Sequence, residues 1–323
     1  MPFPLLRLPH LAQFEVIKSM RFSEIFFLPQ VSPKFIKLVG WALPKNSPSL
    51  EIYFIFRQNK FEAEIYSIGP EISAEVESTY RIGDEVLNTV DHGKIVSCEW
   101  VGSGSVEQNE ESMRKLFKYF LELLNFPKSQ LAFCDNVSEP FAMEMIRYAR
   151  HKNLPLRSID FCLEECSRES LEEVLTGCQP DEEFQIAIDF PKNLKYTAPP
   201  GGFRMKHLDA SEGHWINLDD FLQCQKITAK SGFEHVTAEY LNGFFKNVKS
   251  MECKTETLEL CSEKKWNFSV MVEGLSGRPI HVEQNVEARK FERNDGVMMV
   301  VFRWKDTLYM RPLTDCWHKF DNI

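Results

Sequence analysis

The chain has 323 residues, of which 43% are hydrophobic, 26% charged and 12% aromatic, and its formal net charge at pH 7 is −9. This apolar content suffices for a substantial core and excludes an intrinsically disordered tail or linker protein, while the length predicts one large or two ordinary domains. The sequence contains no run of about 20 consecutive apolar residues, so we expect neither a membrane-spanning helix nor a membrane partner.

The first residues and the cysteines both favour an intracellular protein. Residues 1–6 lack the basic segment, the apolar stretch and the cleavage site that secretion requires. The nine cysteines are sparse and odd in number, unlike a disulfide framework. Cys162 and Cys166 lie four residues apart, but no second Cys/His pair follows at zinc-ligand spacing. We therefore expect a cytoplasmic or nuclear protein with reduced thiols and without a metal or other cofactor.

Charge is distributed unevenly along the chain. Residues 1–45 hold six lysines and arginines against two acidic residues, a net charge of +4, which leaves −13 for the remainder. Proteins that bind nucleic acid draw their non-specific affinity from a basic face. The negative charge of residues 46–323 thus argues against a nucleic-acid partner. The positive charge of residues 1–45 suits an acidic protein partner.

Residues 8–28 predict short helices, because apolar side chains recur there at helical spacing. Leu8-Pro9 opens this stretch, and residues 21–23 interrupt the pattern before Glu24, where we expect a second helix to begin. Prolines fragment the chain beyond residue 28, and residues 44–48 have the composition of a linker. A domain boundary is predicted between residues 45 and 46.

From Leu50 the hydrophobic period changes from helical spacing to two. Ile52, Phe54 and Phe56 alternate with polar neighbours, and a second alternating run from Phe61 to Ile65 follows a short polar turn, which predicts a β-hairpin. Further strands are predicted over residues 75–82 and 95–101. Residues 102–111 are expected to form an exposed loop.

The middle of the chain alternates short β-like pieces with the amphipathic stretches 138–152, 168–176 and 237–248. The β-like pieces begin near Leu131, Ile159, Ile186, Leu208, Ile227 and Met251. Their steps of 28, 27, 22, 19 and 24 residues fall around the period of leucine-rich repeats. We predict a degenerate leucine-rich-repeat-like array, with an ordinary α/β domain as the alternative. Strands over 297–304 and 307–310 close the chain, after a tight-turn signal at 294–296.

No catalytic constellation emerges from the sequence. The glycines at 102, 104, 201 and 202 match neither a phosphate-binding loop nor a dinucleotide fold, and Ser103 and Ser105 do not sit in a nucleophile elbow. Phe244-Phe245 and residues 297–302 are expected in the core. We expect a protein that is not an enzyme.

The acidic pair Asp219-Asp220 is the strongest candidate for acid/base or metal chemistry. Because Asn217 precedes it, we favour a capped helix start. His92, His281 and His318 have no partners at a recognisable spacing. An enzyme would require two residues of one set to converge in a pocket, namely His92, His207, His214, Asp219 and Asp220.

Two blocks of the sequence resemble one known family. Residues 3–9 (Phe-Pro-Leu-Leu-Arg-Leu-Pro), followed by Leu11, Glu15-Val16, Lys18, Met20 and Glu24-Ile25, resemble the F-box of the large nematode F-box family. Residues 215–222, 241–245 and 293–296 resemble the type 2 F-box-associated domain found downstream in that family. The resemblance covers most of the chain and is least distinct over 46–110. It implies α+β or α/β architecture: an all-α F-box at 1–45, then an associated domain at 46–323, leucine-rich-repeat-like and flanked by β-rich segments.

The resemblance also implies a function. In the family, the F-box docks on the Skp-type adaptor of an SCF-type cullin-RING E3 ubiquitin ligase, and the associated domain recruits a protein substrate. Other subunits transfer the ubiquitin, so the chain itself would be non-catalytic and would need no cofactor. Carried over by position, the adaptor-binding residues are Leu8, Pro9, Leu11, Val16, Ile17, Met20, Ile25 and Leu28.

The chain departs from the family pattern in its last predicted F-box helix. Phe22 stands where the family has proline, and residues 28–34 replace a Leu-Ser-x-Cys-Ser-Lys run. Pro29 and Pro33 fall within that helix's position, and proline shortens or breaks a helix interior. This leaves a second hypothesis open, an intracellular protein-binding scaffold whose degenerate F-box no longer joins a ligase.

Overall fold

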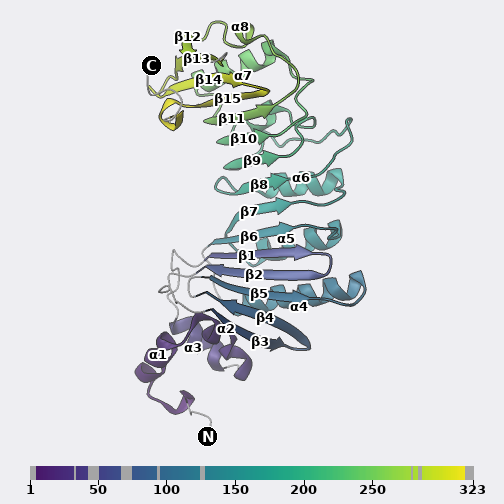
Figure 1. Ribbon diagram of the computed structural model, residues 1–323, viewed down its shortest axis with the longest axis vertical. Coiled ribbons are helices and arrows are strands. Elements are labelled where there is room, and N and C mark those ends of the chain that lie inside the picture. The colour runs from purple at the N-terminus through teal and green to yellow at the C-terminus, as the bar shows by residue number, and fades with distance from the viewer. Residues whose placement is uncertain are drawn as a thin grey trace. The chain divides into compact units, whose positions relative to one another are not determined.

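The computed structural model describes residues 5–32, 34–42, 51–66, 75–92, 95–123, 128–277, 279–282 and 286–316 (Figure 1). The chain divides into two compact units, residues 1–158 and 159–323. Helices and strands occur in both units, and the strands pair in parallel and antiparallel fashion, so the fold is mixed α/β as predicted. The domain boundary predicted between residues 45 and 46 lies outside the described residues, and the division into 1–45 and 46–323 stays a prediction.

The first unit opens with short helices. They are η1 (Leu5–Arg7), α1 (His10–Ser19), α2 (Phe22–Val31) and α3 (Lys34–Ala42). Helix α2 begins two residues before the predicted Glu24, because the Glu24 carboxylate accepts a hydrogen bond from the backbone N–H of Arg21 at 2.9 Å and so caps the helix start. The helix also continues through Pro29 to Val31, so Pro29 does not break it. Pro33 lies outside the described residues.

Helix α2 packs on strands of the first unit. The Ser23 hydroxyl donates a buried hydrogen bond of 2.5 Å to the Asp91 carboxylate at the end of β4 (Glu85–Asp91). The Phe27 ring stacks on Tyr80 of β3 (Val76–Ile82), with ring centroids 3.5 Å apart. One face of α2 is therefore covered by the chain's own sheet.

The remaining elements of the first unit are a sheet and two helices. They are β1 (Glu51–Arg57), β2 (Lys60–Tyr66), β3, β4, β5 (Ile95–Val101), α4 (Val106–Leu123), β6 (Lys128–Phe133) and α5 (Glu139–His151). The strand order is β6-β1-β2-β5-β4-β3, in which β6 pairs parallel to β1 and the other pairs are antiparallel. This confirms the predicted β1–β2 hairpin and strands β3 and β5. Strand β4 was not predicted.

The exposed loop predicted over 102–111 is wrong from Val106 onward, where α4 begins. Ser105 and Gln108 form a capping box: the backbone N–H of Ser105 donates to Gln108 Oε1 at 2.9 Å, and that of Gln108 donates to Ser105 Oγ at 3.4 Å. Apolar residues at helical spacing then fill the core between α4 and β1, including Met113 and Phe117, whose ring meets Phe54 edge-on at 4.8 Å. Because the first turn of α4 is largely polar, the hydrophobic pattern of the sequence did not indicate this helix.

Strand β7 (Leu156–Phe161) crosses the division between the units. The elements beyond it are α6 (Arg168–Gly177), β8 (Glu183–Ile186), β9 (His207–Ala210), η2 (Leu218–Phe221), β10 (Lys226–Ala229), α7 (Ala238–Ser250), β11 (Thr257–Cys261), α8 (Phe268–Met271), β12 (Pro279–Val282), β13 (Val286–Glu292), β14 (Met298–Trp304), β15 (Thr307–Pro312) and η3 (Leu313–Cys316). Strands β8 to β11 pair in parallel. Strand β15 pairs antiparallel to β11. The antiparallel pairing then continues from β15 to β14, from β14 to β13 and from β13 to β12. The predicted closing strands are thus β14 and β15.

A strand followed by a capped helix recurs along the chain. The N-cap residue stands 10 or 11 positions after the first residue of the preceding strand for β6, β7, β9, β10 and β11, and these caps are Ser138, Ser167, Asn217, Thr237 and Asn267. In the first four, the cap side chain accepts a backbone N–H of the helix. The predicted cap at Asn217 is thereby confirmed.

Four predicted strand starts differ from the structure. Leu131, Ile159 and Ile186 each lie three residues after the first residue of β6, β7 and β8, so that Ile186 ends its strand. Met251 starts no strand, because it terminates α7 in the left-handed conformation with φ of 69°, and β11 begins at Thr257. A helix C-terminus with an apolar residue looks like the start of a strand when only hydrophobicity is read.

Candidate functional site

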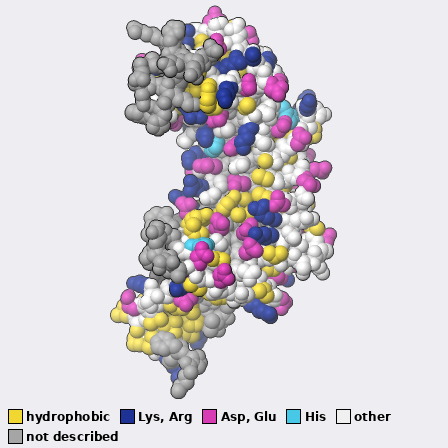
Figure 2. Space-filling model, viewed as in Figure 1, with side chains coloured by type: hydrophobic (Ala, Val, Ile, Leu, Met, Phe, Trp, Pro, Cys, Tyr) yellow, Lys and Arg dark blue, Asp and Glu magenta, His cyan; other side chains and the backbone are white. Residues whose placement is uncertain are grey.

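The N-terminal helices carry apolar side chains on their surface (Figure 2). Leu11, in the first turn of α1, is 80% exposed, and Leu6 of η1 is 40% exposed. Pro9 is also exposed, whereas Leu8, Val16, Met20 and Leu28 are half-buried. Exposed leucines in adjacent elements create apolar surface that favours contact with a partner.

Two of the predicted adaptor-binding residues lie inside the protein. Ile17 is 0% exposed and Ile25 is 5% exposed, and both belong to the core of the N-terminal helices. A partner reaches neither side chain without rearrangement of these helices. Leu6, Pro9 and Leu11 are exposed and Leu8 between them is half-buried, and these four residues are called the N-terminal patch below.

The second unit holds a pocket of about 420 Å³ between the loops that follow β9 and β10. It is lined by His214, Trp215, Ile216, Asn217, His235, Val236, Thr237 and Tyr240. Parallel strands end at the same edge, so the loops after them lie side by side. The two loops approach each other closely at Gly213, where a Cβ atom would lie 1.9 Å from the ring of Phe233.

The two histidines of this pocket each hold Nδ1 toward an acceptor. His214 Nδ1 lies 3.0 Å from the Glu212 carboxylate, and His235 Nδ1 lies 3.2 Å from the carbonyl oxygen of Gly232. Both partners are acceptors, so each Nδ1 carries a proton. His214 Nε2 is buried and has no hydrogen-bond partner among the described residues.

Tyr240 and Asn217 tie the two loops together. The Tyr240 hydroxyl donates to Asn217 Oδ1 at 3.0 Å and accepts from the backbone N–H of Asp219 at 3.2 Å. Burial, with the negative charges of Asp219 and Asp220, raises the pKa of Tyr240 well above that of a free phenol. The hydroxyl therefore stays protonated and keeps donating, which fixes this wall of the pocket.

The residues that an enzyme would have required do not gather in this pocket. Of the set His92, His207, His214, Asp219 and Asp220, His214 alone lines it. His92 pairs with Glu75 in the first unit, and His207 lies on β9 with Nε2 3.2 Å from Thr228 Oγ1. Asp220 instead accepts a hydrogen bond from the Tyr196 hydroxyl at 3.1 Å.

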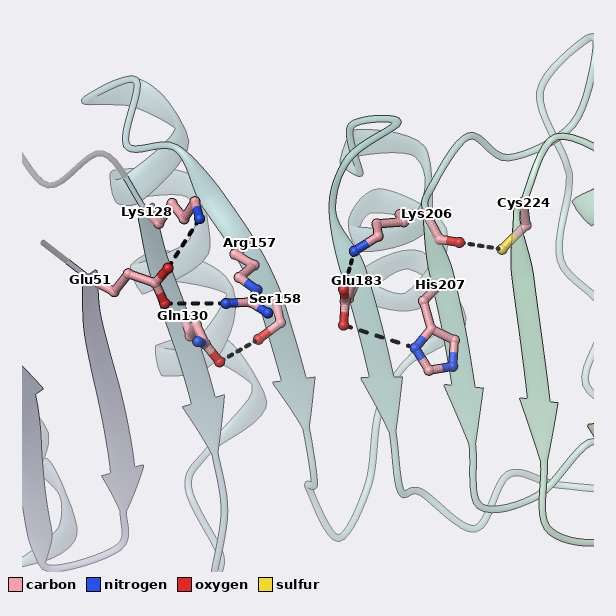
Figure 3. A network of polar contacts seen from close by, with 9 residues as sticks. All are labelled: Glu51, Lys128, Gln130, Arg157, Ser158, Glu183, Lys206, His207 and Cys224. Carbon is pink, nitrogen blue, oxygen red and sulfur yellow. Dashed lines mark hydrogen bonds and ion pairs between the residues drawn. The ribbon is translucent and has the colours of Figure 1, made fainter. Parts of the chain in front are cut away.

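Each unit has polar side chains that interact between its neighbouring strands (Figure 3). In the first unit, Glu51 accepts from Lys128 at 3.1 Å and from Arg157 at 3.2 Å. In the second, Lys206 donates to Glu183 at 2.7 Å. Burial, followed by the charge of Lys226, lowers the pKa of His207, which keeps that ring neutral beside Glu183.

The other face of the parallel strands is buried. Along β8 to β11 the buried residues alternate with these polar positions and include Phe184, Leu208, Ile227 and Leu258. The polar face is thus the side of the sheet that a partner can reach.

The described residues hold no candidate metal site and no helix fit to cross a membrane. No three His, Cys, Asp or Glu side chains come together there as a candidate metal site. Among the same residues, no helix combines the length and the apolar character that crossing a lipid bilayer needs. The side chain of His281 and the whole of His318 lie outside the described part of the chain.

Comparison with known proteins reveals a similarity to a nematode protein. Over 266 residues the chain is 21% identical to the "Skn-1 dependent zygotic transcript 15 protein" of Caenorhabditis elegans, a match that covers 77% of this chain and 76% of the relative. No family model and no solved structure matches the chain. The similarity agrees with the nematode family expected from the sequence, while the F-box and its associated domain stay predictions.

Proposed function

We propose that the chain is the substrate-recognition subunit of an SCF-type cullin-RING E3 ubiquitin ligase. Residues 1–45 act as an F-box that docks on the Skp-type adaptor. Residues 46–323 form a type 2 F-box-associated domain that binds a target protein for ubiquitination. The chain supplies binding surfaces, and other subunits of the ligase carry out the chemistry.

The observation that carries this proposal is the exposure of Leu11, 80% accessible in the first turn of α1. Removing apolar area from water contributes about 25 cal/mol per Å², so a partner that covers the N-terminal patch gains from each of its side chains. The basic character of residues 1–45 adds attraction to an acidic adaptor. Similarity to a nematode protein over most of the chain is in keeping with the family that the sequence resembles.

For the target-binding domain, we infer a leucine-rich-repeat-like array. Its support is the parallel pairing of β8 to β11 and the recurrence of a strand with a helix cap 10 or 11 residues later. Such units bury their apolar faces on their neighbours. The polar face of the sheet and the pocket after β9 and β10 then remain for recognition.

The scaffold hypothesis differs from this proposal at the helix that contains Pro29. Because α2 spans Phe22–Val31 without a break at that proline, the helical surface of the N-terminal segment is continuous there. Pro29 therefore gives no support to the scaffold hypothesis, whereas α2 ends at Val31, two residues before Pro33.

Binding of the intact chain to a purified Skp-type adaptor tests the proposal, with isothermal titration calorimetry as the assay. The informative variant is Leu11→Asp, because an acidic residue in the first turn of α1 suits the helix dipole and so leaves the helix intact. We expect at least tenfold weaker adaptor binding, since the aspartate places a charge in an apolar interface.

Val106→Asp is the matched control. Val106 is 38% exposed and is the first residue of α4, so the substitution introduces the same charge at an equivalent helix position away from the N-terminal patch. It should bind the adaptor as the intact chain does. A folded intact chain that does not bind would overturn the ligase proposal and favour the scaffold; equal loss in both variants would refute the N-terminal patch as the docking site.

A further inference from the structure

The pocket between the loops after β9 and β10 offers no partner of opposite charge to an ion. Among the described residues that line it, none is a lysine, arginine, aspartate or glutamate. A charged group that enters such a site gives up its hydration without gaining an ion pair, and this exchange costs free energy. The pocket therefore favours an uncharged ligand.

The polar side chains of the lining form hydrogen bonds within the protein. Asn217 Oδ1 accepts from the Tyr240 hydroxyl at 3.0 Å, and Asn217 Nδ2 donates to the Asp220 carboxylate at 3.1 Å. Thr237 Oγ1 accepts from the backbone N–H of Tyr240 at 3.1 Å. His214 Nε2 is buried, so a ligand does not reach it. What these side chains present to a ligand is therefore mainly their apolar surface.

The backbone carbonyl of Val236, which also lines the pocket, is occupied as well. Its oxygen accepts from Lys264 Nζ at 3.0 Å and from Trp266 Nε1 at 2.9 Å. The same ammonium group of Lys264 donates to the carbonyl oxygen of Glu234 at 2.9 Å. A carbonyl oxygen has two lone pairs, so the carbonyl of Val236 is saturated. A ligand gains little from hydrogen bonds at this position.

Three of the lining residues carry rings, namely Trp215, His235 and Tyr240. The Trp215 ring meets Phe190 edge-on with centroids 5.5 Å apart, and the His235 ring stacks on Phe233 with centroids 5.9 Å apart. The hydrogen bonds of its hydroxyl fix the third ring, that of Tyr240. Rings held in place in this way form a preorganised site, and they attract a further ring by more than the burial of its area.

We propose that this pocket binds an aromatic side chain of the target protein, with phenylalanine as the simplest case. The volume of about 420 Å³ suits one large side chain rather than a folded segment. The uncharged lining disfavours basic and acidic side chains, and contacts between rings favour an aromatic side chain over an aliphatic one. The inference rests on the proposed role of residues 46–323 in target recognition and names the class of side chain that one part of that domain binds.

The test uses the full chain and four blocked pentapeptides, Gly-Ser-X-Ser-Gly, in which X is phenylalanine, leucine, alanine or arginine. Binding is followed by the methyl NMR signals of ¹³C-labelled isoleucine, among which Ile216→Val identifies the signal from the pocket. The phenylalanine peptide should shift this signal saturably. It should bind about tenfold more tightly than the alanine and arginine peptides and about threefold more tightly than the leucine peptide. The absence of a saturable shift, or equally tight binding of any of the other three peptides, would overturn the inference.

Two variants locate the site. His235→Ala removes one ring of the lining from an exposed position and should weaken binding of the phenylalanine peptide about threefold. His151→Ala, which removes an exposed histidine of α5 in the other unit, should change nothing. Thermal unfolding of both variants establishes that they fold, and unchanged binding in His235→Ala would refute the pocket.

Failure of this inference is distinguishable from failure of the proposed function. Adaptor binding depends on the N-terminal patch, and Leu11→Asp should weaken it without changing the peptide titration. A chain that binds the adaptor but not the phenylalanine peptide contradicts the pocket alone. A folded intact chain that does not bind the adaptor contradicts the ligase proposal and leaves the peptide result as it stands.

Discussion

Replacing Gly213 by alanine tests the packing of the two loops that make the pocket. A Cβ atom at this position would lie 1.9, 2.4 and 2.9 Å from three carbon atoms of the Phe233 ring. Phe233 is fully buried, so its ring has no free space into which to move. Overpacking of this kind costs about 1–3 kcal/mol and occasionally more. Because the overlap involves three ring atoms, we expect Gly213→Ala to lower the free energy of unfolding by about 3 kcal/mol.

Gly243 offers a matched substitution with the opposite sign. It lies on the exposed side of α7, and a Cβ atom there would meet nothing within 4 Å. Alanine loses less conformational entropy than glycine in a helix, so Gly243→Ala should raise the free energy of unfolding by about 0.5–1 kcal/mol.

Chemical denaturation of the intact chain and both variants, followed by circular dichroism and tryptophan fluorescence, measures the two effects. The expected midpoints lie below that of the intact chain for Gly213→Ala and above it for Gly243→Ala. If Gly213→Ala unfolds at the same denaturant concentration as the intact chain, the close approach of the two loops is wrong, and with it the pocket.

Three further changes probe other parts of the account. Phe27→Ala should cost about 3–5 kcal/mol, because the ring is buried and stacked on the sheet, and faster protease cleavage within residues 5–42 would reveal it. Thr237→Ala removes the cap of α7 and should cost about 1 kcal/mol in the same denaturation assay; no change would contradict the cap. The hydrogen bonds from Arg293 lower the pKa of Asp295 to about 2. This pair stabilises the fold at neutral pH and loses its contribution as pH falls from about 4 toward 2, so Asp295→Asn should show a shallower loss of stability over that range, measured by acid titration of circular dichroism.

Local patterns predicted the regular elements of the fold. Alternating hydrophobicity identified β1 and β2, and helical spacing identified α5 to within one residue at each end, because Ser138 and Lys152 mark its caps. The core positions Phe244 and Phe245 were also correct. Each of these features depends on residues that are neighbours in the sequence.

Features that depend on distant residues were missed. Strand β4 has exposed and half-buried residues at several positions, and its hydrogen bonds with β3 and β5 define it rather than its hydrophobicity. The burial of Ile17 and Ile25 follows from the packing of the N-terminal helices, which helical spacing alone does not orient. For the pocket, Gly213 and Gly232 at matching positions after β9 and β10 were a usable signal, because close approach of two loops requires residues without a side chain.

Hydrogen exchange of the intact chain, free and with a Skp-type adaptor, tests the central claim most directly. Exchange slows where a partner covers the backbone or stabilises a helix that otherwise frays. The account predicts that the adaptor protects η1 and α1, at residues 5–19, and leaves β8 to β11 unchanged. An adaptor that binds while protecting only the strands, or that protects no residue, would contradict docking through the N-terminal helices.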